Sequence, residues 1–308
     1  MREPVLNRSC PLCNEDKSRL FLRKESLRLV RCQSCSMVYA KAVGSEFASG
    51  SFYDQRGESF YLASDKLQGD HAPVRFEREL KLFRAYCQQG SVLDVGCSTG
   101  GFLIALKSRH PKDYSVFGTD VVGSALDYAE QHGVEVIRTP FLELSEKQTS
   151  FDAVTFWAVI EHLVEPKRFL SKAARLLKPG GYCFVLVPNL KSLAVRVLGA
   201  KYRYIMPEHV NYFTPATLRA FARSGPEFEV VTLTSTHFNP VVILKDFVGK
   251  GRGVPDAERA GLLKRTTAWK QNRWLGPVKV VYSLAERMLA AFNLADNLVF
   301  VLRKKRAD

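Results

Sequence analysis

Short apolar runs alternate with amphipathic stretches through the middle of the chain. Strands are predicted at 91–95, 115–121, 134–138, 151–159 and 182–187, and helices between them at 101–109, 123–132 and 166–177. Strands that alternate with helices in this way form a parallel, doubly wound α/β sheet. Because such sheets bind ligands at the carboxyl ends of their strands, we expect the functional residues in the loops that follow the strands.

Further elements flank this core. A helix at 73–87 precedes the first strand, and two more strands are predicted at 228–236 and 297–303. The intervening residues 237–296 form a long insertion with one helical apolar stripe, whose polar side carries Lys279, Glu286 and Arg287. The stripe consists of Val278, Val281, Ala285, Met288 and Phe292. The pattern leaves open whether this helix packs on the core, covers a substrate, forms a dimer surface or rests on a membrane.

The turn after the first strand is the first candidate site. Gly96, Gly100 and Gly101 allow a tight turn, and the following helix directs its positive end toward it. Asp94 would repel a pyrophosphate, but it suits a ligand with an ammonium group, such as the methionine end of S-adenosylmethionine. Asp120 follows the second strand, where it either accepts both ribose hydroxyls or caps a helix.

Four segments together resemble the class I S-adenosylmethionine-dependent methyltransferases. They are residues 92–102 (VLDVGCSTGGF), 116–120 (VFGTD), 151–163 (FDAVTFWAVIEHL) and 175–181 (RLLKPGG). The resemblance implies a seven-stranded Rossmann-like sheet whose last strand is antiparallel and lies beside the sixth. It also implies cofactor contacts from Asp94, Gly96, Ser98, Gly100, Asp120 and Trp157. Ser98 stands where the family usually has glycine.

Glu161 and His162 follow the fourth strand, at the edge of the sheet that faces the transferred methyl group. In the methyltransferases that this chain resembles, including ubiquinone-biosynthesis O-methyltransferases, an equivalent Glu-His pair borders the active site, and some members use it for a divalent ion or for acid/base work. A histidine with a pKa near neutrality can take a proton from an acceptor hydroxyl. The alternatives are that Glu161 caps the next helix and that His162 is a packed structural residue.

A second histidine lies in the segment 201–215, which follows the fifth strand. This segment resembles the loop with which small-molecule methyltransferases approach their acceptors through a His-x-x-Tyr-Phe pattern. His209 is thus a second candidate base, with bonding to a loop carbonyl as its alternative. The resemblance assigns acceptor contacts to Glu208, Tyr212 and Phe213.

Two Cys-x-x-Cys pairs near the N-terminus have metal-ligand spacing. Cys10, Cys13, Cys32 and Cys35 are separated by 18 residues between the pairs, and alternating strand patterns lie between them. We expect a structural Zn²⁺ in a ribbon over residues 1–43, with redox-active cysteines as the alternative. Residues 44–72 are predicted to be an aromatic-bearing linker, which docks either on the cofactor mouth or beneath the zinc module. Residues 73–308 then form the methyltransferase domain.

The chain carries a net charge of +14, and from Lys245 onward it has 14 Lys and Arg against 6 Asp and Glu. That basic region suits a nucleic acid or an anionic membrane surface. No apolar run spans a bilayer and the N-terminus lacks a signal-peptide pattern, so we expect a cytoplasmic protein with at most peripheral membrane contact.

These features predict an enzyme that transfers a methyl group from S-adenosylmethionine to a small metabolite. The preferred acceptors, on resemblance, are a nucleotide sugar or a natural-product or polysaccharide precursor. One alternative is an RNA methyltransferase that holds nucleic acid with the zinc ribbon and the basic region, although stacking aromatics for RNA are not evident. Another is a catalytically silent scaffold that binds the cofactor.

Overall fold

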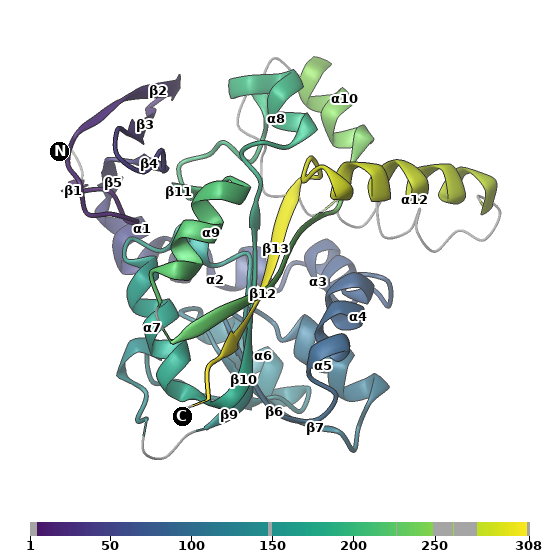
Figure 1. The fold of residues 1–308 in the computed structure, drawn as a ribbon. Coiled ribbons are helices and arrows are strands. Elements are labelled where there is room, and N and C mark those ends of the chain that lie inside the picture. Colours follow the sequence, from purple (N-terminus) through teal and green to yellow (C-terminus); the bar gives the residue numbers. More distant parts are fainter. Residues whose placement is uncertain (1–4, 147–149, 226, 249–260, 262–275, 307–308) are drawn as a thin grey trace.

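A seven-stranded sheet forms the centre of the computed structural model, which describes residues 5–146, 150–225, 227–248, 261 and 276–306 (Figure 1). Its order is β12-β13-β10-β9-β6-β7-β8. The strands are β6 (Gly90–Val95), β7 (Tyr114–Thr119), β8 (Glu135–Val136), β9 (Phe151–Trp157), β10 (Leu177–Pro188), β12 (Phe228–Thr236) and β13 (Asn297–Lys304). The predicted α/β sheet is confirmed.

The strand directions also match the prediction. β6 pairs in parallel with β7 and β9, and β10 pairs in parallel with β9. β13 runs antiparallel to both of its neighbours, β10 and β12. Residues at the start of β13 therefore lie at the same edge of the sheet as the carboxyl ends of the parallel strands.

Helices cover both faces of the sheet, since successive side chains of a strand point to opposite faces and both sets are apolar. On β10, Phe184 packs in one buried cluster with side chains of the first face, whereas Val185 packs in another. The first face carries α4 (Glu77–Tyr86), α5 (Gly101–Arg109) and α6 (Gly123–Gln131), and the second carries α7 (Pro166–Leu176) and α9 (Pro215–Arg223).

The cysteine-bearing segment forms a second, smaller sheet. β2 (Ser18–Lys24), β3 (Leu27–Cys32) and β4 (Val38–Ala40) are antiparallel, and β11 (Asn211–Tyr212) pairs with β4 as a fourth strand. β1 (Val5–Asn7) pairs separately with β5 (Ala42–Gly44). Figure 1 shows these N-terminal strands beside β11 and α9. Because β11 lies far away in the sequence, this sheet is shared between the two parts of the chain.

Short helices connect the two sheets. Residues 45–70 form α1 (Ser45–Ser49), α2 (Ser51–Tyr61) and α3 (Ser64–Asp70). The loops at the site edge contain the 3-10 turns η1 (Phe141–Glu143), η2 (Ile160–His162) and η3 (Gly199–Lys201) and the helix α8 (Leu193–Leu198). The segment predicted to be a linker thus contains three short helices.

The insertion between β12 and β13 contains the helices α10 (Pro240–Val248) and α12 (Gly276–Ala291), and α12 projects from the body of the molecule (Figure 1). One prediction about α12 was wrong. Glu286 is only 4% exposed, because it forms an ion pair with Arg78, whereas Met288 and Phe292 are 66% and 71% exposed. The side chains of Val278, Lys279 and Val281 lie outside those the structure describes. Within the described ranges, no helix is long and apolar enough to cross a membrane.

Candidate active site

A cavity of about 470 Å³ opens at the carboxyl ends of β6, β9 and β10. One wall is the turn after β6, with Asp94, Gly96 and Ser98. The lining also includes Glu161, His209 and residues of the insertion. Other residues that line the cavity are Lys66, Asp70, Arg75, Glu79, Trp157, Tyr204, Met206, His237, Asn239 and Asp296. The cavity lies at the edge of the sheet where parallel α/β folds bind their ligands.

The turn after β6 is a close-fitting cradle. Gly96 has a φ of +73°, and a Cβ there would lie 2.6 Å from Cγ2 of Val159, so a larger residue would displace the loop after β9. Ser98 also adopts a left-handed φ, of 52°, which is uncommon for a residue with a side chain. Gly100 starts α5. The backbone at this turn therefore lies close to the cavity, as cofactor binding requires.

Asp94 is buried beside this turn and lines the cavity. Its Oδ1 accepts a hydrogen bond from the Thr155 hydroxyl over 2.6 Å. Burial raises the pKa of Asp94 to about 7, and the nearby charge of Asp120 adds to this. A cationic ligand would favour the ionised carboxylate, which makes Asp94 the fitting partner for an ammonium group.

Asp120 lies behind the turn and is not among the residues that line the cavity. Its Oδ2 accepts the backbone N–H of Ser98 over 2.8 Å, and its Oδ1 accepts that of Val122 over 3.0 Å. Each oxygen keeps lone-pair capacity beyond these bonds. In this structure Asp120 fixes the turn around Ser98 and the start of α6.

Glu161, His162 and His209 converge on the other side. Each side chain offers one potential metal-ligand atom, and these three atoms lie within 4.8 Å of one another. The ring centroids of His162 and His209 are 4.7 Å apart. Glu161 is 1% exposed, and neither carboxyl oxygen has a hydrogen-bond partner among the described residues. Burial raises its pKa to about 8. A carboxyl beside two imidazoles can share a proton, and it is also a set that binds divalent cations.

The contacts of His162 fix its tautomer. Its Nδ1 lies 2.8 Å from the carbonyl oxygen of Glu208 and 2.7 Å from the Tyr53 hydroxyl. Since a carbonyl only accepts hydrogen bonds, Nδ1 carries the proton, and the lone pair of the neutral ring is on Nε2. Tyr53 comes from α2, and its role was not predicted. Among the aromatic residues of the segment 44–72, Tyr53 thus contacts His162, and Phe60 lines the cavity.

The predicted acceptor contacts are placed differently. Glu208 is buried and pairs with Arg56 over 3.3 Å, the Tyr212 hydroxyl donates to the carbonyl of Met206, and Phe213 packs against Phe221. None of the three lines the cavity. The reason is that Tyr212 belongs to β11, whose pairing with β4 directs its side chain into a core. Tyr204, Met206 and His209 face the cavity instead.

The four cysteines have the geometry of a tetrahedral thiolate site. All four Sγ atoms lie within 4.8 Å of one another, with Cys10 and Cys35 at 3.4 Å and Cys13 and Cys32 at 3.5 Å. A tetrahedral ion with Zn–S bonds of about 2.3 Å needs sulfur separations of roughly 3.8 Å. The residues therefore fit Zn²⁺, and four protein ligands leave no open position.

Several lining residues were missed by the sequence reasoning. Lys66 and Asp70 form an ion pair at the i,i+4 spacing of α3, which was the available sequence signal. His237, Asn239 and Asp296 flank the insertion. These residues could have been found from the topology. An antiparallel last strand begins at the edge of the sheet where the parallel strands end, which is the edge that carries the site.

Comparisons with known proteins agree with this geometry. Residues 70–232 match the family model described as "Methyltransferase domain". The ubiquinone biosynthesis O-methyltransferase of Caulobacter vibrioides is 33% identical over 51% of this chain and 66% of its own length, and that of Paracidovorax citrulli is 32% identical over 49% and 68%. The chain thus spans about two thirds of these relatives.

A solved structure from Thermotoga maritima, titled a SAM-dependent methyltransferase and possible histamine N-methyltransferase, shares the fold. Its TM-score is 0.50 at 18% identity, covering 83% of this chain and 97% of that one. Together with the matched domain, the sheet order and the cradle around Asp94, this shows that the chain belongs to the class I S-adenosylmethionine-dependent methyltransferases.

Proposed function

We propose that this chain transfers the methyl group of S-adenosylmethionine to a hydroxyl of a small acceptor. One observation carries the proposal: the cradle with Asp94 and the cluster of Glu161 and His209 line the same cavity. A cofactor on one wall and an acceptor on the other would be held for in-line transfer, and alignment of the reacting atoms supplies most of the rate of such a step.

On the cofactor side, Asp94 would pair with the ammonium group, and the backbone at Gly96, Ser98 and Gly100 would contact the rest of the ligand. Trp157 lines the cavity, and its buried indole N–H has no hydrogen-bond partner in the described part of the chain. We also propose that Asp120 accepts hydrogen bonds from the ribose. Bound S-adenosylmethionine supplies an electrophilic methyl group on a sulfonium, which is a good leaving group.

On the acceptor side, His209 lines the cavity and would take the proton of the acceptor hydroxyl. As the oxygen–carbon bond forms, the carbon–sulfur bond breaks and the sulfur keeps the electron pair. The charge of the imidazolium would lower the pKa of Glu161 again, and the ionised carboxylate would in turn stabilise the imidazolium. His162, held by Glu208 and Tyr53, would position His209. It does not line the cavity, so we propose it as the second candidate base after His209. Glu208, Tyr212 and Phe213 would act from behind, by supporting the loop.

The acceptor class rests on two supports. The two relatives are named O-methyltransferases, which favours oxygen as the reacting atom. The loop 201–215 resembles acceptor loops of small-molecule methyltransferases, so we propose a nucleotide sugar or a natural-product or polysaccharide precursor. We further propose that Cys10, Cys13, Cys32 and Cys35 hold a structural Zn²⁺ and that the enzyme works in the cytoplasm.

The test measures S-adenosylhomocysteine formed by the metal-analysed full chain with three kinds of acceptor. These are hydroxylated small molecules, primary amines and bulk RNA. We expect turnover with hydroxylated small molecules. Turnover that requires RNA would support the RNA alternative instead, and cofactor binding without turnover on any acceptor would support the silent scaffold.

A further inference from the structure

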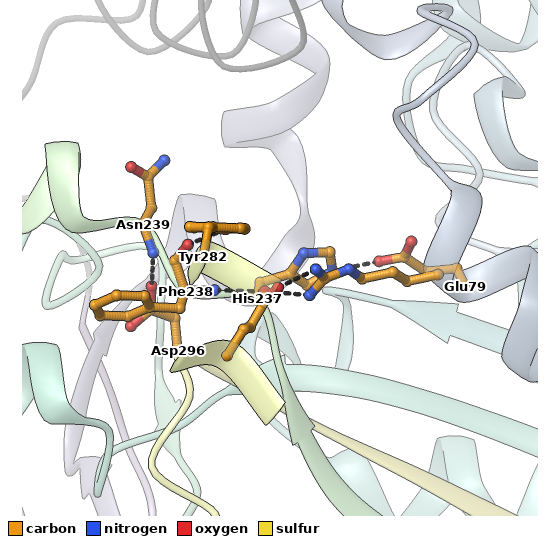
Figure 2. A network of polar contacts seen from close by, with 8 residues as sticks. Glu79, His237, Phe238, Asn239, Tyr282 and Asp296 are labelled. Atoms are coloured by element: carbon orange, nitrogen blue, oxygen red, sulfur yellow. Dashed lines mark hydrogen bonds and ion pairs between the residues drawn. The ribbon is translucent and has the colours of Figure 1, made fainter. Parts of the chain in front are cut away.

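A second polar cluster lines the same cavity at the two ends of the insertion. Figure 2 shows it: Glu79 of α4 points toward His237, and Asp296 lies beside Asn239 in the loops around the insertion. All four residues line the cavity. They come from α4, from the loop after β12 and from the residue just before β13. Neither the cofactor contacts nor the proposed proton transfer uses them.

Asp296 is held firmly. Its backbone N–H donates to the carbonyl of His237 over 2.7 Å, and its own carbonyl accepts the N–H of Asn189 over 2.9 Å. Its Oδ2 accepts the N–H of Asn239 over 3.0 Å. The side chain is 6% exposed, and Oδ1 has no hydrogen-bond partner within the described ranges. One carboxyl oxygen is therefore used to anchor the group, and the other remains unused.

Glu79 has the same division of roles. Its Oε1 lies 2.6 Å from Nε2 of His237, while Oε2 is buried and has no partner in the part of the chain that the structure describes. His237 adopts a left-handed φ of 60°, which is uncommon for a residue with a side chain. The neighbouring residue is also held, since Glu286 accepts the N–H of Phe238 and pairs with Arg78.

These carboxyls give the cavity wall an excess of hydrogen-bond acceptors. Glu79, Glu161 and Asp296 contribute acceptor oxygens that have no hydrogen-bond partner among the described residues. On the same criterion Trp157 and Arg75 contribute one donor each, and the Ser98 hydroxyl can donate or accept. A buried polar atom left unpaired costs about 1–3 kcal/mol, so the wall favours a ligand that donates hydrogen bonds. Hydroxyl groups of an acceptor can donate such bonds without placing a second cation next to the sulfonium of the cofactor.

We propose that Asp296 and Glu79 form an acceptor subsite that takes hydrogen bonds from hydroxyl groups flanking the one that is methylated, so the acceptor is polyhydroxylated. This inference rests on the proposed function. Both ends of the insertion are then part of the acceptor site. The ion pair of Arg78 and Glu286 fixes the position of the subsite. Asp296 is then a specificity-determining residue.

The experiment titrates the full, zinc-loaded chain with UDP-glucose, UDP-galactose and myo-inositol by calorimetry, with S-adenosylhomocysteine already bound. At least one of these probes is expected to bind. Its Kd should rise roughly tenfold or more in Asp296→Asn, which keeps the bond to Asn239 but presents a donor in place of the unused acceptor. Asp127→Asn, on the exposed side of α6, is the matched control and should bind like the native chain.

Monodeoxy analogues of the bound probe, tested on the native chain, provide a second measurement that does not depend on a variant folding. Removal of at least one hydroxyl should weaken binding by roughly tenfold. Equal affinity in Asp296→Asn and for every analogue would overturn the subsite and leave the proposed function standing. Failure of all three probes while a phenol binds, or while S-adenosylhomocysteine binds alone, would also overturn it. Failure of S-adenosylhomocysteine to bind the folded native chain would overturn both proposals.

Discussion

The backbone N–H of Val210 donates a hydrogen bond to the carbonyl of Glu161 over 2.9 Å, and the carbonyl of Val210 accepts the N–H of Ala40 over 3.0 Å. The two backbone hydrogen bonds of Val210 thus connect the small cysteine-bearing sheet to η2. Asn211 adds side-chain bonds to the carbonyls of Ile160 and Leu163, and Arg8 donates to Asn211. The cluster of Glu161, His162 and His209 is therefore positioned by the module that holds the cysteines.

Loss of Zn²⁺ should consequently reduce turnover more than it reduces cofactor affinity. Without the ion, β4 would no longer be held in place. His209 would then lose its position relative to Glu161. The Asp94 cradle, on the far wall, is built by β6 and α5. We expect Cys13→Ser or chelation to lower kcat by roughly tenfold or more, with a nearly unchanged Kd for S-adenosylhomocysteine.

The matched control for this prediction is Cys87→Ser, which removes a buried thiol outside the cluster. Metal analysis should find about one Zn²⁺ per native chain and per Cys87→Ser chain, and less in Cys13→Ser. An unchanged kcat in a metal-free, folded chain would contradict the structural link between the module and the site.

His209→Asn should lower kcat by roughly a hundredfold or more, because the proposed base would be lost. His162→Asn and Tyr53→Phe should have smaller effects, since these residues act through the orientation of the loop. All three variants should keep the native affinity for S-adenosylmethionine. His110→Asn, at the surface end of α5, serves as the control. If His209→Asn turns over at the native rate, another group removes the proton of the acceptor hydroxyl.

Acid stability should depend on Glu79. Burial alone would raise the pKa of this carboxyl, but the attraction and hydrogen bond of His237 outweigh it and lower the pKa from 4.5 to about 2. A lowered pKa stabilises the folded state above the unfolded value, and this contribution disappears as the pH falls through the folded value. Glu79→Gln should therefore cost about 3 kcal/mol of the free energy of unfolding at pH 7.

The difference between native and Glu79→Gln, measured by urea unfolding, should shrink by more than half between pH 7 and pH 3. Both proteins would release Zn²⁺ in acid, so the comparison removes that common effect. A difference that stays constant over this range would show that Glu79 acts through packing and not through its charge.

The sheet and the cradle were predictable because their signals are local. The strand 91–95, the turn at Gly96 and the acid at Asp94 are adjacent in sequence, so the periodicity and the residue types specify both the fold and the cofactor wall. The two cysteine pairs likewise carry their spacing with them. Each of these features depends on interactions over a few residues.

The acceptor wall could not be predicted in the same way. Tyr53 reaches His162 across more than a hundred positions, and Asp296 reaches the site only because β13 runs antiparallel. The orientation of Tyr212 depends on the pairing of β11 with β4, two segments whose sequences show no mutual signal. These positions depend on pairing between segments that are far apart in the sequence. The local propensities of the residues do not predict such pairing.

Calorimetric titration of the metal-analysed native chain with S-adenosylmethionine, beside Asp94→Asn and the control Asp127→Asn, tests the central claim most directly. The account predicts saturable binding at one site in the native and control proteins, weakened by roughly tenfold or more in Asp94→Asn, because the ammonium would lose its charged partner. A folded native chain that does not bind, or an Asp94→Asn chain that binds equally well, would contradict the assignment of this cavity as the cofactor site.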